Sequence, residues 1–269
     1  MFATTLATFA SVVYMRMRCG NDDNGDDDDD DEFIKRLRER MRSSSSTTRR
    51  RPFVTLTFAQ SVDGNLALRK GQPTRLSGQE SMVMTHRLRA FHDGILVGVG
   101  TVIADNPSLT TRLVPGSNPK PIVLDSRLRI PLDSKLLNSD KCERPIIITS
   151  KTSNTKTARL IQDKGATVLY CNVEKSSGHI CLSAAMELLK SSLKINSLMV
   201  EGGASVLSSF LSSRLGDELI VTVAPCFLMG GLSYGNNVTP SPASRLDLHS
   251  VITRSVGHGD VLIAGSLSK

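Results

Sequence analysis

The chain alternates short apolar runs with longer segments at helical spacing, and this alternation constrains its fold more than any other feature. The apolar runs cover residues 53–59, 95–99, 121–124, 146–149, 167–169, 197–200 and 218–223. The helix-length segments cover residues 79–92, 155–164, 182–193 and 204–215. This pattern predicts an α/β domain with a mostly parallel central sheet flanked by helices. Beyond it we expect a loop rich in Gly and Pro over 229–242 and a final strand over 260–263.

The predicted domain begins where the composition changes, at residue 52. Residues 1–51 contain an acidic run at 26–31 and a hydroxyl run at 43–48. Because such compositions resist collapse, we expect residues 1–51 to form a largely disordered, low-complexity tail, with a short basic helix over 32–42 as the alternative. Residues 52–269 show no internal repeat and no second core, so we expect them to form one domain.

The charge of the chain lies in this predicted domain. The whole chain has 33 basic and 26 acidic residues, a net charge of +7, and its first 51 residues hold ten of each. The remainder therefore carries 33 − 10 = 23 basic and 26 − 10 = 16 acidic side chains. This modest excess favours phosphorylated small molecules as ligands. With 4% aromatic residues and no Trp, a base-stacking nucleic-acid platform is not expected. The open alternative is a tail that binds nucleic acid or a scaffold.

The cysteines and the N-terminus indicate the cellular setting. The five cysteines are scattered without a C-x-x-C pair, which is typical of reduced intracellular thiols, and we predict no metal site. The apolar stretch over residues 1–14 is too short to span a bilayer. We therefore expect a cytoplasmic protein without a membrane partner, and an organelle-targeting role of the first residues stays open.

Candidate ligand-binding residues follow the apolar runs, because ligands of parallel α/β sheets bind beyond the carboxyl ends of the strands. Gly202 and Gly203 separate a strand from a helix, an arrangement in which backbone amides bind an anion, although a tight structural turn is the alternative. Neither a G-x-G-x-x-G nor a Walker sequence is present, and no serine lies in a G-x-S-x-G elbow. Arg89 and Arg112 are candidate phosphate ligands, with surface positions as the alternative.

Four motifs then follow one another in a specific order. They are TLTFAQSVDG at 55–64, THRLR with HDGILVG at 85–98, GTVIADNP at 100–107 and VEGGA at 200–204. Together they resemble the pyrimidine reductases of riboflavin biosynthesis, which share the dihydrofolate reductase-like fold. The resemblance runs from Pro52 to Ala264 and implies an NADPH-dependent oxidoreductase, with NADH as an open alternative, and a homodimer.

The resemblance also implies roles for individual residues. The cofactor would be bound by Thr101, Asp105, Ser126, Gly202, Gly203, Ala204 and Ser205. The substrate, a phosphorylated ribosylamino-pyrimidine, would be lined by Ser61, Asp63, Arg89, Leu109, Arg112 and Glu201. Of these, the two arginines would take the 5′-phosphate, Ser61 and Asp63 would shape the floor of the pocket, and Glu201 would be the catalytic residue that orients the substrate.

Two departures bear on the substrate. Thr57 stands where many bacterial relatives carry Lys, so no role of that Lys transfers to this chain. No deaminase motif precedes the reductase motifs, which favours the stand-alone fungal and archaeal type. We therefore expect reduction of 2,5-diamino-6-ribosylamino-4(3H)-pyrimidinone 5′-phosphate. The deaminated 5-amino-6-(5-phosphoribosylamino)uracil, or a folate or pterin, are the alternative substrates.

Overall fold

The computed structural model describes residues 32–44, 49–69, 71–72, 74–233, 245–257 and 259–268. The chain divides into two compact units, Met1–Lys35 and Arg36–Lys269, and the sheet lies in the second. Much of the predicted tail, residues 1–31 and 45–48, lies outside the described residues, as does most of the predicted loop. Among the helices that the structure describes, none has the length and apolar character needed to cross a membrane.

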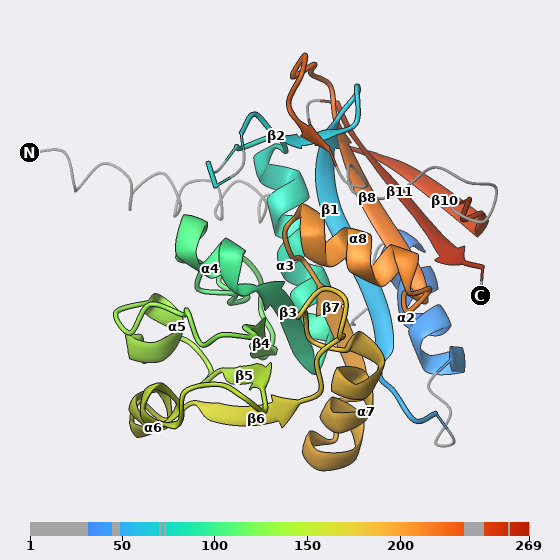
Figure 1. The fold of residues 1–269 in the computed structure, drawn as a ribbon. Helices are drawn as coiled ribbons and strands as arrows, with labels where there is room; N and C mark the ends of the chain where they lie inside the picture. Colours follow the sequence, from blue (N-terminus) through green and yellow to red (C-terminus); the bar gives the residue numbers. More distant parts are fainter. Residues whose placement is uncertain are drawn as a thin grey trace, which may run out of the picture. The chain divides into compact units, whose positions relative to one another are not determined.

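The second unit is built on a nine-stranded sheet with the order β10-β11-β8-β1-β7-β3-β4-β5-β6 (Figure 1). Its strands are β1 Phe53–Ser61, β3 Gly94–Gly98, β4 Lys120–Leu124, β5 Ile146–Ser150, β6 Thr167–Cys171, β7 Ser197–Val200, β8 Glu218–Ala224, β10 Leu248–Val256 and β11 Asp260–Leu267. The strands from β8 to β6 are all parallel, whereas β11 is antiparallel to β8 and β10 to β11. The predicted α/β fold with a mostly parallel sheet is therefore confirmed.

Helices cover both faces of this sheet. The helices among the described residues are α2 Glu32–Ser44, α3 Gln79–Phe91, α4 Val99–Asp105, α5 Lys135–Asn138, α6 Thr155–Asp163, α7 Leu182–Leu193 and α8 Ala204–Ser212. One core packs α7 and α8 against one face, and a second core packs α4, α5 and α6 against the other. Ile146 and Ile148 belong to the first core and Ile147 to the second. Because both faces are covered, the strands appear in the sequence as continuous apolar runs.

The predicted helices and strands are confirmed within a few residues, and the exceptions have physical reasons. Residues 99–105, expected to be the end of a strand and then a loop, form α4. Val99 and Val102 are buried there one turn apart, so packing overrides the weak helix propensity of this β-branched segment. The pattern did not predict β10 because it is an edge strand whose residues are mostly exposed. The small sheet of β2 (Asn65–Ala67) and β9 (Leu232–Ser233) was also missed.

The segment before residue 52 contributes charged contacts to this unit. The short basic helix over 32–42, which the sequence left as the alternative, lies within α2. From it, Arg40 forms an ion pair with Glu218 at 2.6 Å, and its guanidinium also donates to the carbonyl of Ser250. Arg51 binds Asp217 through two hydrogen bonds of 2.6 and 2.9 Å, and Arg49 binds the same carboxylate. The predicted boundary at Arg51 thus lies inside the unit Arg36–Lys269.

Candidate active site

Strand register brings the predicted site residues to one edge of the sheet. Leu56 of β1 lies level with Val200 of β7, so the next residue, Glu201, emerges beside the middle of β1. Gly98 of β3 lies level with Leu124 of β4, so α4 starts beside the turn that contains Ser126. The carboxyl ends of parallel strands are the edge at which α/β proteins bind ligands.

Glu201 is held by Arg89 of α3. The Nε and Nη2 atoms of Arg89 donate to the two carboxylate oxygens of Glu201 at 2.6 and 2.7 Å, and Nη1 donates to the carbonyl of Thr110 at 2.9 Å. The Arg89 side chain is buried, which by itself lowers the pKa of the guanidinium, but the charge and hydrogen bonds of Glu201 raise that pKa above its ordinary value. The guanidinium fork that the sequence assigns to a phosphate thus faces Glu201 in this structure.

Arg112 has a different environment from Arg89. It is exposed, and it has no hydrogen bond or ion pair within the part of the chain that the structure describes. His86 lies near both arginines: its pKa is lowered to about 4, first by burial and then by the positive charges of Arg89 and Arg112. The His86 ring is fully buried, and neither ring nitrogen has a hydrogen-bond partner among the described residues. Both candidate phosphate ligands therefore lie close enough to His86 for their charges to lower its pKa.

Helix α3, which carries Arg89, is fixed at both ends by other elements. At its start, Asp260 of β11 accepts hydrogen bonds from the Gly78 amide at 2.7 Å and the Ser81 hydroxyl at 2.6 Å. After its last residue, the Nε2 atom of His92 lies 2.9 Å from the Thr55 hydroxyl of β1. These contacts fix the position of Arg89 relative to the strand ends.

The segment after α4 contacts the pair of Arg89 and Glu201 through the Thr110 carbonyl, which accepts from Arg89. Leu109 has a left-handed backbone, with φ of +52°, and its side chain is buried in the core that contains α4. This conformation is strained for leucine, and it precedes the Thr110 carbonyl that binds Arg89. Thr111 is held by Asn118, whose side-chain oxygen accepts from the Thr111 amide at 2.9 Å. Leu109, predicted to line the substrate, therefore offers its backbone rather than an exposed side chain.

The two predicted cradle glycines lie where the starts of α4 and α8 meet. A Cβ on Gly202 would lie 3.2 Å from the Val97 Cα and 3.3 Å from the Gly98 amide nitrogen. Gly203 has a φ of +56°, and a Cβ there would lie 3.1 Å from the Thr101 hydroxyl oxygen. Glycine is therefore favoured at both positions, at Gly202 by close approach and at Gly203 by backbone conformation. Unpaired amides at the start of α8 suit the phosphates of a dinucleotide, so these residues fit the predicted cofactor.

The other predicted cofactor residues lie around this cradle at different depths. Ala204 and Ser205 begin α8, and Ser126 follows β4 with its side chain partly exposed. Asp105 is exposed at the opposite end of α4 from the cradle. The structure thus brings Thr101 to the glycines and leaves Asp105 about one helical turn away, roughly 6 Å along the axis.

Ser61 and Asp63 form the turn after β1. The Ser61 hydroxyl donates to Asp63 and accepts from the Asn65 amide at 3.0 Å. Asp63 also accepts from the amides of Leu228 and Met229, at 3.1 and 2.9 Å. These bonds, that of Ser61 foremost, lower the pKa of Asp63 to about 2. The sequence indicated the turn but not the segment after β8, because that contact joins residues 165 positions apart.

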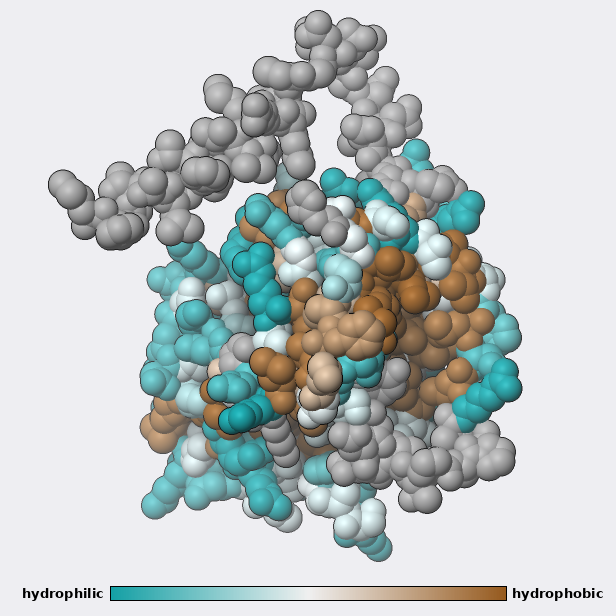
Figure 2. All heavy atoms as spheres, turned by 90° about the horizontal axis from the view of Figure 1, so that it is seen from above, coloured by the Kyte–Doolittle hydropathy of each residue, from teal (hydrophilic) through white to brown (hydrophobic). Residues whose placement is uncertain are grey.

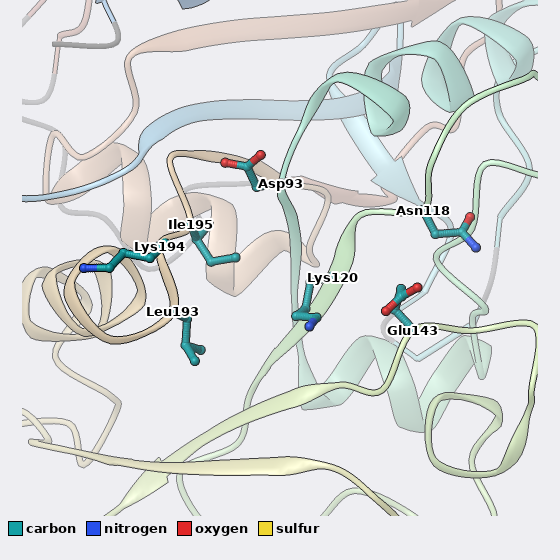
Figure 3. A pocket seen from close by; sticks show the side chains of 7 residues that line it. All are labelled: Asp93, Asn118, Lys120, Glu143, Leu193, Lys194 and Ile195. Atoms are coloured by element: carbon teal, nitrogen blue, oxygen red, sulfur yellow. The ribbon is translucent and has the colours of Figure 1, made fainter. Parts of the chain in front are cut away.

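A surface pocket at the opposite edge of the sheet is separate from this site. It lies where β3 and β4 begin, and Figure 3 shows acidic and basic side chains around it, among them Asp93, Lys120 and Lys194. The Asp93 carboxylate already accepts from the amides of Asn196 and Ser197, at 2.7 and 3.0 Å. None of the predicted site residues lines this pocket.

A glycine cradle, with an exposed arginine that has no partner among the described residues, is typical of α/β enzymes that act on phosphorylated small molecules. The family model of the RibD C-terminal domain matches residues 52–259, so the chain belongs to the RibD C-terminal domain family. The family resemblance predicted from the four motifs is thereby confirmed.

Relatives of this family fall into two kinds. The chain is 35% identical over 233 residues to the 2,5-diamino-6-ribosylamino-4(3H)-pyrimidinone 5′-phosphate reductase of Candida glabrata, which covers 81% of this chain and 90% of the relative. It is 40% identical over 187 residues to the riboflavin biosynthesis protein RibD of Aquifex aeolicus, covering 69% of this chain but 50% of the relative. The match to the first kind thus extends over nearly the whole relative.

Solved structures of riboflavin-biosynthesis proteins have folds similar to that of this chain. The riboflavin biosynthesis reductase Rib7 of Saccharomyces cerevisiae has a TM-score of 0.70 and 28% identity, covering 88% of this chain and all of that one. RibD of Acinetobacter baumannii has a TM-score of 0.69 and 25% identity, covering 88% of this chain and 63% of that one.

Proposed function

We propose that this chain reduces the ribosyl group of 2,5-diamino-6-ribosylamino-4(3H)-pyrimidinone 5′-phosphate to the ribityl group, with NADPH as the reductant. The observation that carries the proposal is the match over 90% of the Candida glabrata reductase of that name. The geometry of the carboxyl edge supports it, because the glycine cradle and the exposed Arg112 accompany the buried pair of Arg89 and Glu201 there.

The reaction adds two electrons and two hydrogens to C1′ and its attached nitrogen in the opened ribosyl group. When bound, the nicotinamide cofactor supplies a hydride to C1′, and a proton on the nitrogen completes the reduction. The work of the protein is to hold the two reactants in the correct orientation. We assign the cofactor phosphates to the Gly202–Gly203 cradle with Thr101 and Ser205.

Glu201 is suited to orient the substrate. Its two oxygens are fixed by Arg89, yet each carboxylate oxygen has a further lone pair that can accept from the amino groups of a pyrimidine. Arg112 is exposed and unpaired among the described residues, so we assign the 5′-phosphate chiefly to it. Arg89 contributes positive potential from behind Glu201.

The preference for NADPH over NADH rests on the turn after β4. Arg127 and Arg129 are exposed there on either side of the buried Leu128, and Ser126 precedes them. Neither arginine has a hydrogen bond or ion pair within the described ranges. Guanidinium groups in this position suit the extra phosphate of NADPH. A cytoplasmic homodimer, without nucleic-acid or membrane partners, is part of the same proposal and rests on the family resemblance.

The test is a paired-substrate assay that follows the near-ultraviolet absorbance of NADPH. The diamino substrate should be reduced at least tenfold more efficiently than the deaminated one, and a folate or pterin should not be reduced at all. A preference for the deaminated substrate would change the substrate assignment. No turnover with either pyrimidine would refute the proposed function.

A further inference from the structure

The Asp63 carboxylate makes more contacts than its turn requires. One oxygen accepts from the Ser61 hydroxyl and the Leu228 amide, and the other accepts from the Asn65 side chain and the Met229 amide. The bonds to Ser61 and Asn65 stay within the turn. Those to Leu228 and Met229 fasten the segment Pro225–Gly231, which follows β8, onto the end of β1. The Val62 amide reinforces this junction by donating to the Cys226 carbonyl at 2.9 Å.

This junction lies beyond the candidate active site along the direction of the parallel strands. β1 and β8 pair as far as Ser61 and Ala224, whereas β7 ends level with Leu56. The β1–β8 ribbon therefore extends five residues beyond the end of β7, which is about 16 Å at ~3.3 Å per residue. The junction at Asp63 forms the far end of this extension, on the same edge of the sheet as Glu201 and the glycine cradle.

The fastened segments carry exposed hydrophobic side chains. Phe227 is 66% exposed, Met229 is 88% exposed and Val62 is 51% exposed. Figure 2 views the molecule from the side that carries β2 in Figure 1 and shows hydrophobic residues gathered on this face. Exposed apolar side chains that form a contiguous patch mark binding sites for ligands or partners.

We propose that Asp63 is a positioning residue, whose carboxylate holds Pro225–Gly231 so that Phe227 and Met229 form an apolar wall for a planar heteroaromatic ring. This proposal rests on the proposed function, which supplies two such rings, the pyrimidine of the substrate and the nicotinamide of the cofactor. Asp63 acts through backbone amides rather than by touching the ring. The role differs from the floor of the pocket that the family resemblance implies for Asp63.

The test compares Asp63→Ala, Phe227→Ala and their double variant with the unaltered protein. Asp133→Asn is the matched control, because Asp133 is exposed and has no contact within the described residues. We expect Asp63→Ala and Phe227→Ala each to raise one KM at least fivefold, whereas the control leaves both unchanged. A rise in KM for the pyrimidine assigns the wall to the substrate, and a rise for NADPH assigns it to the cofactor.

Two readouts separate positioning from a merely structural role. Hydrogen exchange of the Leu228 and Met229 amides should be at least tenfold faster in Asp63→Ala, while the melting temperature stays close to that of the control. The double variant should have the same KM as the more impaired single variant, because Asp63 acts through the segment that carries Phe227. Additive effects, or unchanged amide exchange, would overturn the proposal.

The proposal can be tested even if Asp63→Ala fails to fold. In that case the KM values of Phe227→Ala and Met229→Ala are measured, and unchanged values in both variants would refute the apolar wall. If the unaltered protein does not turn over either pyrimidine, the proposed function fails. NADPH affinity, measured by titration, then tests the wall by itself: weaker binding in Phe227→Ala supports it and equal binding overturns it.

Discussion

Arg89 and Arg112 show how residues of one type acquire different tasks from their surroundings. Arg89 is buried, and its fork is taken by both oxygens of Glu201. Arg112 is exposed, and its guanidinium is unpaired among the described residues. Removing a buried charge partner leaves the other charge uncompensated, whereas removing an exposed cation affects chiefly the ligand that it binds. Arg112 is therefore the better residue with which to test phosphate recognition.

Arg112→Ala should raise KM for the phosphorylated substrate roughly tenfold to a hundredfold, as expected for losing about 1.5–3 kcal/mol of a charge-assisted contact. Its melting temperature should not change. Arg87→Ala provides the control, because Arg87 is exposed on α3 and also lacks a partner among the described residues. If both variants show the same KM as the unaltered enzyme, Arg112 does not bind the phosphate.

His92 gives the folded state a dependence on pH. Burial lowers its pKa to about 4, outweighing the opposite effect of the Leu88 carbonyl. In the unfolded chain the pKa is near 6.5, so between pH 6.5 and 4 the unfolded state binds a proton that the folded state does not. The stabilisation is complete above pH 6.5 and is lost as pH falls toward 4, on the order of 3 kcal/mol in all.

Urea unfolding at pH 7 and pH 5 should therefore show a smaller free energy of unfolding at the lower pH. In His92→Gln this difference should shrink, with the remainder coming from His86, whose pKa is lowered in the same direction. An equal pH dependence in the variant would show that His92 is not the source.

At the scale of elements, Gly203 at the start of α8 is constrained both by its backbone conformation and by a close neighbour. Gly203 needs a positive φ, and it lies against Thr101 of α4, so a side chain there would intrude into the space assigned to phosphates. Gly178 also has a positive φ, +69°, but nothing lies within 4 Å of its Cβ position. The two glycines thus share the backbone cost of substitution and differ in their neighbours.

Gly203→Ala and Gly178→Ala should each lose about 1 kcal/mol of stability from strain at positive φ. Only Gly203→Ala should weaken NADPH binding, by at least tenfold, as measured by titration of cofactor fluorescence. Equal cofactor affinity in both variants would mean that the cradle does not hold the dinucleotide.

The turn after β4 supplies a second element-scale prediction, on the choice of cofactor. In the double variant Arg127→Ala/Arg129→Ala, the ratio of kcat/KM for NADPH to that for NADH should fall at least tenfold, because the extra phosphate loses its cations. Arg159→Ala serves as the control, since Arg159 is exposed and lies on α6 rather than in the turn after β4. A ratio that does not change would place 2′-phosphate recognition elsewhere.

At the scale of the whole molecule, arginines that precede residue 52 pair with buried carboxylates of the sheet. Asp217 and Glu218 are buried, and their partners Arg40, Arg49 and Arg51 come from before residue 52. Burial alone would raise the pKa of Asp217, but hydrogen bonds from Arg51, the Val54 amide and Arg49 hold it below its ordinary value. These arginines therefore stabilise the folded unit Arg36–Lys269.

A chain that begins at Pro52 should be less stable than one that begins at Glu32, by about 3 kcal/mol, because it leaves two buried carboxylates without their cations. Thermal unfolding of both chains beside the full chain measures this, and the chain from Glu32 should retain most of the stability. If the chain from Pro52 melts at the same temperature as the chain from Glu32, the arginine contacts contribute nothing to stability.

The local pattern of residues determined much of this protein. Apolar runs predicted β1 and the strands from β3 to β8, because strands covered on both faces are rich in apolar residues. The two glycines and the four motifs predicted the cradle and the family. Helix α4 escaped prediction because its packing, and not its own propensity, makes it helical.

Only the tertiary structure decided which charged groups meet. Arg89 pairs with Glu201 across 112 positions, Asp63 holds Leu228 across 165, and Arg51 binds Asp217 across 166. Each contact depends on strand order and register, which arise from the crossovers of the whole sheet rather than from any local spacing. The sequence alone therefore determined most of the elements and the family, and it predicted the cradle. The folded sheet decided that one predicted phosphate ligand holds Glu201 and that a predicted floor residue fastens a distant segment.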